Sequence, residues 1–168
     1  MSTVGSDHVL ITVVSPAYNE AEGIDAFHQR LSSATEQVPN ASWEFIYVED
    51  GSTDSTFAQL TDIAGRDDRV RVLRLSRNFG HQLALTCGLD HAKGDAVVVI
   101  DADLQDPPEV IVAMVDAWRD GADVAYGQRR QRAGETWFKK ATAAAYYRLM
   151  SRITDVKIPE QVGDFRLM

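Results

Sequence analysis

The chain of 168 residues contains one cysteine, Cys87, which excludes both a disulfide framework and a zinc site built from several cysteines. It contains no run of about 18 or more apolar residues, so the sequence predicts no transmembrane helix. Residues 1–8 do not combine a basic stretch with an apolar one, which argues against a secretory signal. These absences favour one soluble globular domain exposed to the cytosol.

Positive charge is scarce overall, because the formal net charge is -8, and this argues against a general nucleic-acid binder. The charge is also uneven. Residues 128–157 carry eight Lys or Arg side chains against two acidic ones. An acidic body with one basic segment suggests an anionic partner for that segment, such as a phosphate, a diphosphate or a membrane surface. A solvated helix face would produce the same pattern.

Short apolar runs alternate with segments of helical spacing along the chain. We expect strands at 9–15, 43–48, 70–75, 95–100 and 123–126, and helices at 20–37, 57–63, 81–91, 107–119 and 136–153. Ser52 or Thr53 is the expected N-cap of the second helix. This alternation predicts an α/β fold in which a mostly parallel sheet carries helices on both faces. No G-x-G-x-x-G motif follows the first strand, which disfavours a dinucleotide-dependent dehydrogenase.

The pair Asp101 and Asp103 directly follows the most apolar of the expected strands. Two carboxylates one residue apart at a strand end can reach one hard cation, Mg²⁺ or Mn²⁺, whose other ligands then come from a diphosphate. Aspartate is also common in simple turns, and the pair alone would suit that interpretation. Its position after the buried strand favours the metal site.

Polar segments also follow the first two expected strands. Pro16-Ala17-Tyr18-Asn19-Glu20 offers an aromatic ring for a base beside polar groups for ribose hydroxyls, although it would also suit the acidic first turn of a helix. Asp50, in residues 49–54, can accept hydrogen bonds from a base or a ribose. Ligands of parallel α/β sheets bind outside the carboxyl ends of the strands, so we expect these segments to share one site.

Five segments together resemble the family 2 glycosyltransferases: PAYNE at 16–20, EDGSTD at 49–54, LSRNFGHQLAL at 75–85, DADLQDPPE at 101–109 and VGDFRLM at 162–168. The resemblance is strongest to the polyprenyl-phosphate glycosyltransferases, which include bactoprenol glucosyltransferases and dolichol-phosphate mannose synthases. It implies the GT-A fold, which is Rossmann-like, over residues 1–168. It also implies a C-terminal membrane part beyond these residues. Glu49 departs from the pattern, in which an aspartate is more usual.

The resemblance implies an inverting, metal-dependent transfer of a hexose from a nucleoside-diphosphate sugar to a polyprenyl phosphate. It favours UDP-glucose, with GDP-mannose as the open alternative. It implies that the donor is contacted by Pro16, Tyr18, Glu20, Val48, Asp50, Asp101, Ala102, Asp103 and Gln105. Of these, Asp101 and Asp103 would hold the metal. The expected location is the cytoplasmic side of the membrane, and the chain alone is expected to be soluble.

The acceptor half of the site is expected in the last forty residues. Arg129 resembles an arginine that binds a donor or acceptor phosphate in relatives, and Arg132 and Lys139 could help to hold a lipid phosphate. An apolar stripe in the expected helix 136–153 suits either an anionic membrane surface or packing on the sheet. Asp164 is a candidate general base, with an electrostatic or positioning role as the alternative.

Two other functions remain open from the sequence. A family 2 enzyme could use a soluble or polysaccharide acceptor, and a non-catalytic module could bind the nucleotide sugar without transferring it. His81 is expected to serve in a loop or as a helix cap rather than as a metal ligand, and Cys87 is expected in the core.

Overall fold

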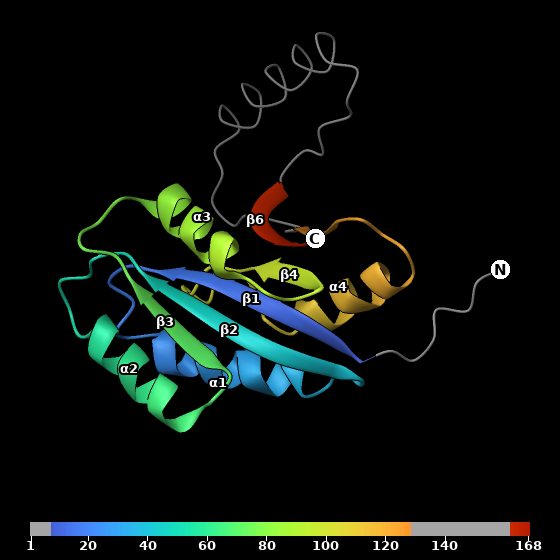
Figure 1. Cartoon of the computed structure of the whole chain (residues 1–168), viewed down its shortest axis with the longest axis horizontal. Helices are drawn as coiled ribbons and strands as arrows, with labels where there is room; N and C mark the ends of the chain where they lie inside the picture. The colour runs from blue at the N-terminus through green and yellow to red at the C-terminus, as the bar shows by residue number, and fades with distance from the viewer. Residues whose placement is uncertain (1–7, 129–161) are drawn as a thin grey trace, which may run out of the picture.

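The computed structural model describes residues 8–128 and 162–168, which form one six-stranded sheet with helices packed on it (Figure 1). The strands are β1 (Val9–Ala17), β2 (Ala41–Glu49), β3 (Val70–Arg74), β4 (Ala96–Val99), β5 (Ala125–Gln128) and β6 (Val162–Leu167). The helices are α1 (Ile24–Thr35), α2 (Thr56–Arg66), α3 (His81–His91) and α4 (Val110–Arg119). None of the helices in these residues is long and apolar enough to cross a membrane.

The strand order is β3-β2-β1-β4-β6-β5, and the ladders from β3 through β2 and β1 to β4 are all parallel. Only β6 runs antiparallel to its neighbours, β4 and β5. The predicted mostly parallel α/β sheet is therefore confirmed. The insertion of β6 between β4 and β5 was not predicted, because the apolar pattern of a strand does not identify its partner.

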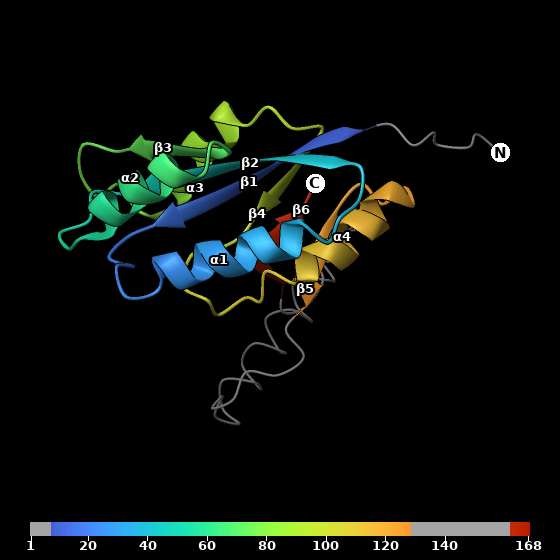
Figure 2. The same cartoon turned by 90° about the horizontal axis from the view of Figure 1, so that it is seen from below.

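Alternate side chains of each strand face opposite sides of the sheet, and each side is covered by helices (Figure 2). The larger core lies under α1, α2 and α4 and contains Phe27, Phe45, Tyr47 and Ile111, all fully or almost fully buried. The smaller core lies under α3. The expectation of helices on both faces is thus confirmed, with α3 alone covering its face among the described residues.

The predicted N-cap of α2 was wrong. The helix begins at Thr56 after Ser55, and neither Ser52 nor Thr53 caps it. Asp54 instead accepts a hydrogen bond from the Thr56 backbone N–H through Oδ1 at 2.9 Å. The hydroxyls of Ser52 and Thr53 instead bond to Asn19 in the loop after β1.

The first helix also begins later than expected, at Ile24 rather than near residue 20. β1 is correspondingly longer and continues to Ala17. Its pairing with β4 ends at Val14, whereas its pairing with β2 continues to Ala17. Pro16, which has no N–H to donate, therefore lies beyond the segment that pairs with β4. The early end of β4 leaves a crevice beside the last residues of β1.

Candidate functional site

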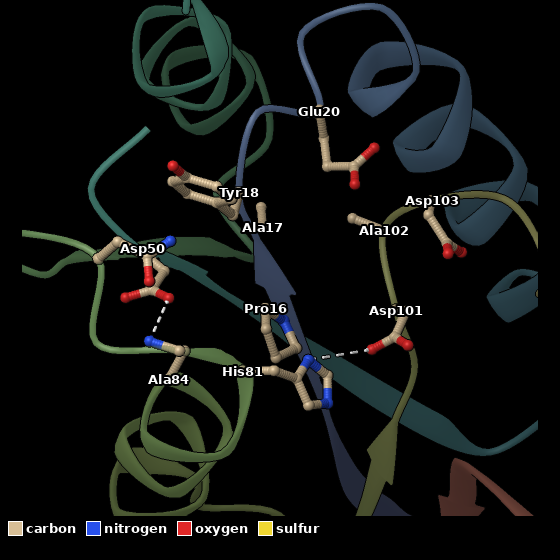
Figure 3. A pocket seen from close by; sticks show the side chains of 12 residues that line it. Pro16, Ala17, Tyr18, Glu20, Asp50, His81, Ala84, Asp101, Ala102 and Asp103 are labelled. Atoms are coloured by element: carbon tan, nitrogen blue, oxygen red, sulfur yellow. Dashed lines mark hydrogen bonds and ion pairs between the residues drawn. The ribbon is translucent and has the colours of Figure 1, made fainter. Parts of the chain in front are cut away.

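An open pocket of about 250 Å³ lies at the carboxyl ends of β1, β2 and β4, against the first turn of α3 (Figure 3). It is lined by Pro16, Ala17, Tyr18, Glu20, Asp50, Asn78, Gly80, His81, Ala84, Asp101, Ala102 and Asp103. Seven of the nine residues expected to contact a donor are among them. Parallel strands bring these segments together because their carboxyl ends lie at one edge of the sheet.

The Asp101-Ala102-Asp103 segment leaves β4 with its two acids at the pocket and its alanine in the core. Ala102 is 1% exposed and packs in the larger core cluster, which anchors the segment between the two carboxylates. The Gln105 backbone N–H donates to Asp103 Oδ1 at 2.9 Å, and Leu104 has a φ of 61°. The segment therefore forms a turn and also presents two carboxylates to the pocket, so the turn does not exclude the predicted metal site.

His81 lies opposite this segment, as the first residue of α3. Its Nδ1 is 3.7 Å from Asp101 Oδ1. Gly80 occupies the N-cap position, so His81 does not cap the helix. The sequence did not predict that His81 lies close to Asp101, because this distance depends on how α3 packs on β1 and β2.

Asp50 is almost fully buried, and both its carboxylate oxygens accept backbone hydrogen bonds. Oδ1 accepts from the Phe79 N–H at 2.7 Å and Oδ2 from the Gly80 N–H at 2.9 Å. Asp50 thus joins the end of β2 to the start of α3 while also lining the pocket. The neighbouring Glu49 is completely buried and accepts from Arg74 Nε at 3.2 Å and from the Ser52 N–H.

Tyr18 and Glu20 close the pocket on the side of the loop after β1, and the Tyr18 side chain is exposed. Partial burial raises the pKa of Glu20, and the negative charges of Asp103, Asp54 and Asp101 raise it further. The pocket therefore concentrates negative charge, which a bound cation would relieve.

The donor set suits a hard divalent cation that completes its coordination from a ligand. Asp101 and Asp103 supply the carboxylate oxygens that Mg²⁺ and Mn²⁺ prefer. Within residues 8–128 and 162–168, no three His, Cys, Asp or Glu side chains are grouped so that they could hold a metal by themselves. An ion at the pair would therefore need oxygens beyond the grouped acids of these described segments, and a diphosphate has oxygens of the kind required.

Two of the expected donor contacts lie away from the pocket lining. Val48 is completely buried in the smaller core with Val14 and Ile46. Gln105 is exposed and does not line the pocket. Residue type and motif position alone could not distinguish these two from the residues that face the pocket.

The expected acceptor residues are largely outside the described part of the chain. Arg129, Arg132, Lys139 and the predicted helix 136–153 belong to residues 129–161. Asp164 lies in β6, where the backbone is described and the aspartate side chain is not. Since Arg166 pairs with Val99 and the strands are antiparallel, the backbone of β6 runs from Arg166 back past the end of β4. This brings the backbone at Asp164 toward the Asp101 end of β4.

Comparison with known sequences identifies relatives over most of the chain. The family model described as "Glycosyl transferase family 2" matches residues 12–168. The "Uncharacterized glycosyltransferase YkcC" of Bacillus subtilis is 48% identical over 97% of this chain and 50% of its own length. The "Bactoprenol glucosyl transferase" of Shigella phage SfV is 42% identical over 94% of this chain and 51% of its own length.

Solved structures share the fold. A crystal structure described only as a mycobacterial protein matches with a TM-score of 0.67 and 23% identity over 95% of this chain and 52% of its own. The mannosyltransferase PcManGT of Pyrobaculum calidifontis, in complex with GDP-Man and Mn²⁺, matches with a TM-score of 0.58 and 25% identity over 73% of this chain and 36% of its own. The expected GT-A fold is thereby confirmed.

The present chain spans about half the length of the curated relatives that it matches. Within that half, the family model covers nearly every residue, and the relatives are well above 30% identical. The sheet and the pocket at its carboxyl edge agree with this assignment. The chain belongs to glycosyl transferase family 2.

Proposed function

We propose that the chain is the donor-binding part of an enzyme that transfers a hexose from a nucleoside-diphosphate sugar to a polyprenyl phosphate. The observation that carries the proposal is the convergence of Tyr18, Glu20, Asp50, Asp101 and Asp103 on one pocket. Similarity to bactoprenol glucosyl transferases favours glucose as the sugar and a polyprenyl phosphate as the acceptor. We propose UDP rather than GDP as the nucleotide, in keeping with the expectation from the sequence.

In this proposal, Tyr18 packs on the base, and Pro16, Glu20 and Asp50 bind around the nucleoside. Val48 and Gln105 do not line the pocket, so we propose them only as secondary contacts of the donor. Asp101 and Asp103 hold Mg²⁺ or Mn²⁺, and Ala102, which also lines the pocket, contacts the donor beside them. The metal, when bound, neutralises charge on the departing nucleoside diphosphate. The first turn of α3 faces the same space, and the positive end of its dipole favours the diphosphate.

The acceptor half is proposed from the sequence. Arg129, Arg132 and Lys139 would hold the lipid phosphate, and Asp164 would orient it or accept a proton. A phosphate oxygen would attack the anomeric carbon as the bond to the diphosphate breaks, which inverts that carbon. The reaction would take place at the cytoplasmic face of a membrane.

The donor half is tested by thermal shift of this chain with UDP-glucose and GDP-mannose, each with and without Mn²⁺. We expect stabilisation by one nucleotide sugar only, and only with the metal. Asp101→Asn and Asp103→Asn should each abolish the shift. Asp116→Asn is the matched control, because Asp116 is an exposed acid on α4 away from the pocket. Equal metal-dependent shifts in all three variants would refute the assignment of the pair.

The acceptor is tested in a protein of the full length of the relatives, by transfer to undecaprenyl phosphate. Transfer that is lost with Asp101→Ala or Asp103→Ala supports the proposal. Glycosylation of a soluble acceptor alone would assign the chain to a different branch of the family. Nucleotide binding without turnover on any acceptor would favour a non-catalytic module.

A further inference from the structure

The loop after β1 and the loop after β2, which border the pocket near Tyr18 and Asp50, are joined by hydrogen bonds in both directions. The Asn19 backbone N–H donates to Ser52 Oγ at 3.0 Å. In return, the Thr53 backbone N–H donates to Asn19 Oδ1 at 2.9 Å, and the Thr53 hydroxyl contacts the same oxygen at 3.3 Å. Asn19 therefore supplies both the donor and the acceptor of this junction.

The next two residues of the first loop continue the junction. The Glu20 N–H donates to Thr56 Oγ1 at 2.8 Å, and the Ala21 N–H donates to Asp54 Oδ2 at 3.2 Å. Three successive backbone N–H groups, from Asn19 to Ala21, thus donate to side chains in the loop after β2 and at the first residue of α2.

Asn19 also has the backbone geometry that the turn needs. Its φ is 56°, in the left-handed region that asparagine tolerates better than most residues. Tyr18 and Glu20, on either side of it, both line the pocket (Figure 3). The conformation of Asn19 and its side-chain acceptor together decide where these two neighbours lie.

We propose that Asn19 is a positioning residue that sets Tyr18 and Glu20 for nucleotide binding without lining the pocket itself. The inference rests on the proposed function, because it assumes that the pocket takes a nucleoside diphosphate. Removing the Asn19 side chain leaves the Thr53 N–H without its acceptor and releases the turn. The free energy of one such hydrogen bond corresponds to a change of roughly three- to tenfold in nucleotide affinity.

The test compares nucleotide affinity in three variants of this chain by titration calorimetry, with UDP and GDP in the presence of Mn²⁺. Asn19→Gly keeps access to the left-handed conformation and loses the acceptor, whereas Asn19→Ala loses both. Asn40→Ala is the matched control, because Asn40 has a φ of 55° and lies at the opposite end of β1, beside Val9. We expect Asn19→Gly to weaken binding roughly three- to tenfold, Asn19→Ala to weaken it further, and Asn40→Ala to bind as the wild type does.

Hydrogen exchange measures whether the hydrogen bonds between the two loops are lost, independently of nucleotide binding. The Thr53 amide should exchange faster in both Asn19 variants and at the wild-type rate in Asn40→Ala. Faster exchange with unchanged nucleotide affinity would overturn the positioning role and leave the proposed function intact. A wild-type chain that binds neither nucleotide would overturn the proposed function together with this inference.

Discussion

Gly51, in the turn after β2, offers a direct test of how the pocket is supported. Its φ is 68°, and a Cβ added there would lie 2.3 Å from the Arg77 carbonyl carbon and 2.4 Å from the Asn78 nitrogen. These are backbone atoms, so no side-chain rotation can relieve the contact. Gly51→Ala must therefore displace the segment at residues 77–78, which leads to the start of α3.

The expected loss of stability has two parts. An L residue in the left-handed region costs about 1–2 kcal/mol, and overpacking against fixed neighbours costs about 1–3 kcal/mol more. The sum is about 2–5 kcal/mol, which for a domain of this size lowers Tm by roughly 10 °C. Asn78 and Gly80 line the pocket, so nucleotide binding should weaken in parallel.

The assay is urea and thermal unfolding followed by circular dichroism, with Gly121→Ala as the matched control. Gly121 follows α4 with a φ of 100°, and a Cβ added there meets nothing within 4 Å. The control therefore isolates the conformational part, about 1–2 kcal/mol. Both variants lose the same unfolded-state freedom of glycine, so that effect cancels in the comparison.

The difference between the two variants measures the close approach of Gly51 to the segment at residues 77–78. If Gly51→Ala is no less stable than Gly121→Ala, Gly51 does not lie in close contact with the backbone at residues 77–78. The turn at Gly51 would then not support the start of α3.

Two further predictions concern buried polar groups away from the pocket. The Thr12 hydroxyl is buried, donates to Glu44 at 2.9 Å and accepts from the Gly94 N–H at 2.9 Å. Thr12→Val should therefore lower the free energy of unfolding in urea by about 1–3 kcal/mol. Thr12→Ser keeps the hydroxyl and should lose less than Thr12→Val, about 0.8 kcal/mol for the missing methyl group, and equal losses in the two variants would contradict this. Burial lowers the pKa of His28, against the opposing charge of Asp67, so the unfolded chain binds the proton more readily. The contribution of His28 to the free energy of unfolding should therefore be complete above pH 6.5, the ordinary histidine pKa. As the pH falls below 6.5, it should decrease by at most about 1.4 kcal/mol per pH unit. His28→Gln should flatten this part of the profile, and an unchanged slope would refute the attribution.

Much of the fold could be predicted because hydrophobic periodicity is a local property. The expected helix at residues 81–91 coincides with α3, and each expected strand in the described part of the chain overlaps an observed one. The start of α1 was placed too early, and the backbone N–H groups of Glu20 and Ala21 form contacts that the spacing did not predict, with Thr56 and Asp54. The cap of α2 was also wrong, and the hydroxyls of Ser52 and Thr53 likewise bond to another loop. Spacing in one segment cannot reveal bonds to another.

The candidate site divides in the same way. Asp101, Asp103 and Tyr18 could be placed at one edge of the sheet, because parallel strands end together. Val48 could not be separated from the pocket residues, because its burial depends on how α3 packs. The hydrogen bonds of Asp50 could not be predicted either, because its partners, Phe79 and Gly80, lie far from it in the chain.

The sequence by itself determined the order of strands and helices, the family, and which strand ends carry the acids of the site. The elements and the positions of the acids follow from residue type and short-range spacing, and the family follows from the resemblance of five short segments to its members. None of these depends on how the molecule packs. Only the tertiary structure decided that β6 lies between β4 and β5, that Asp50 holds the start of α3, and that His81 lies 3.7 Å from Asp101. Each of these depends on contacts between segments far apart in the chain, which form only when the helices pack on the sheet.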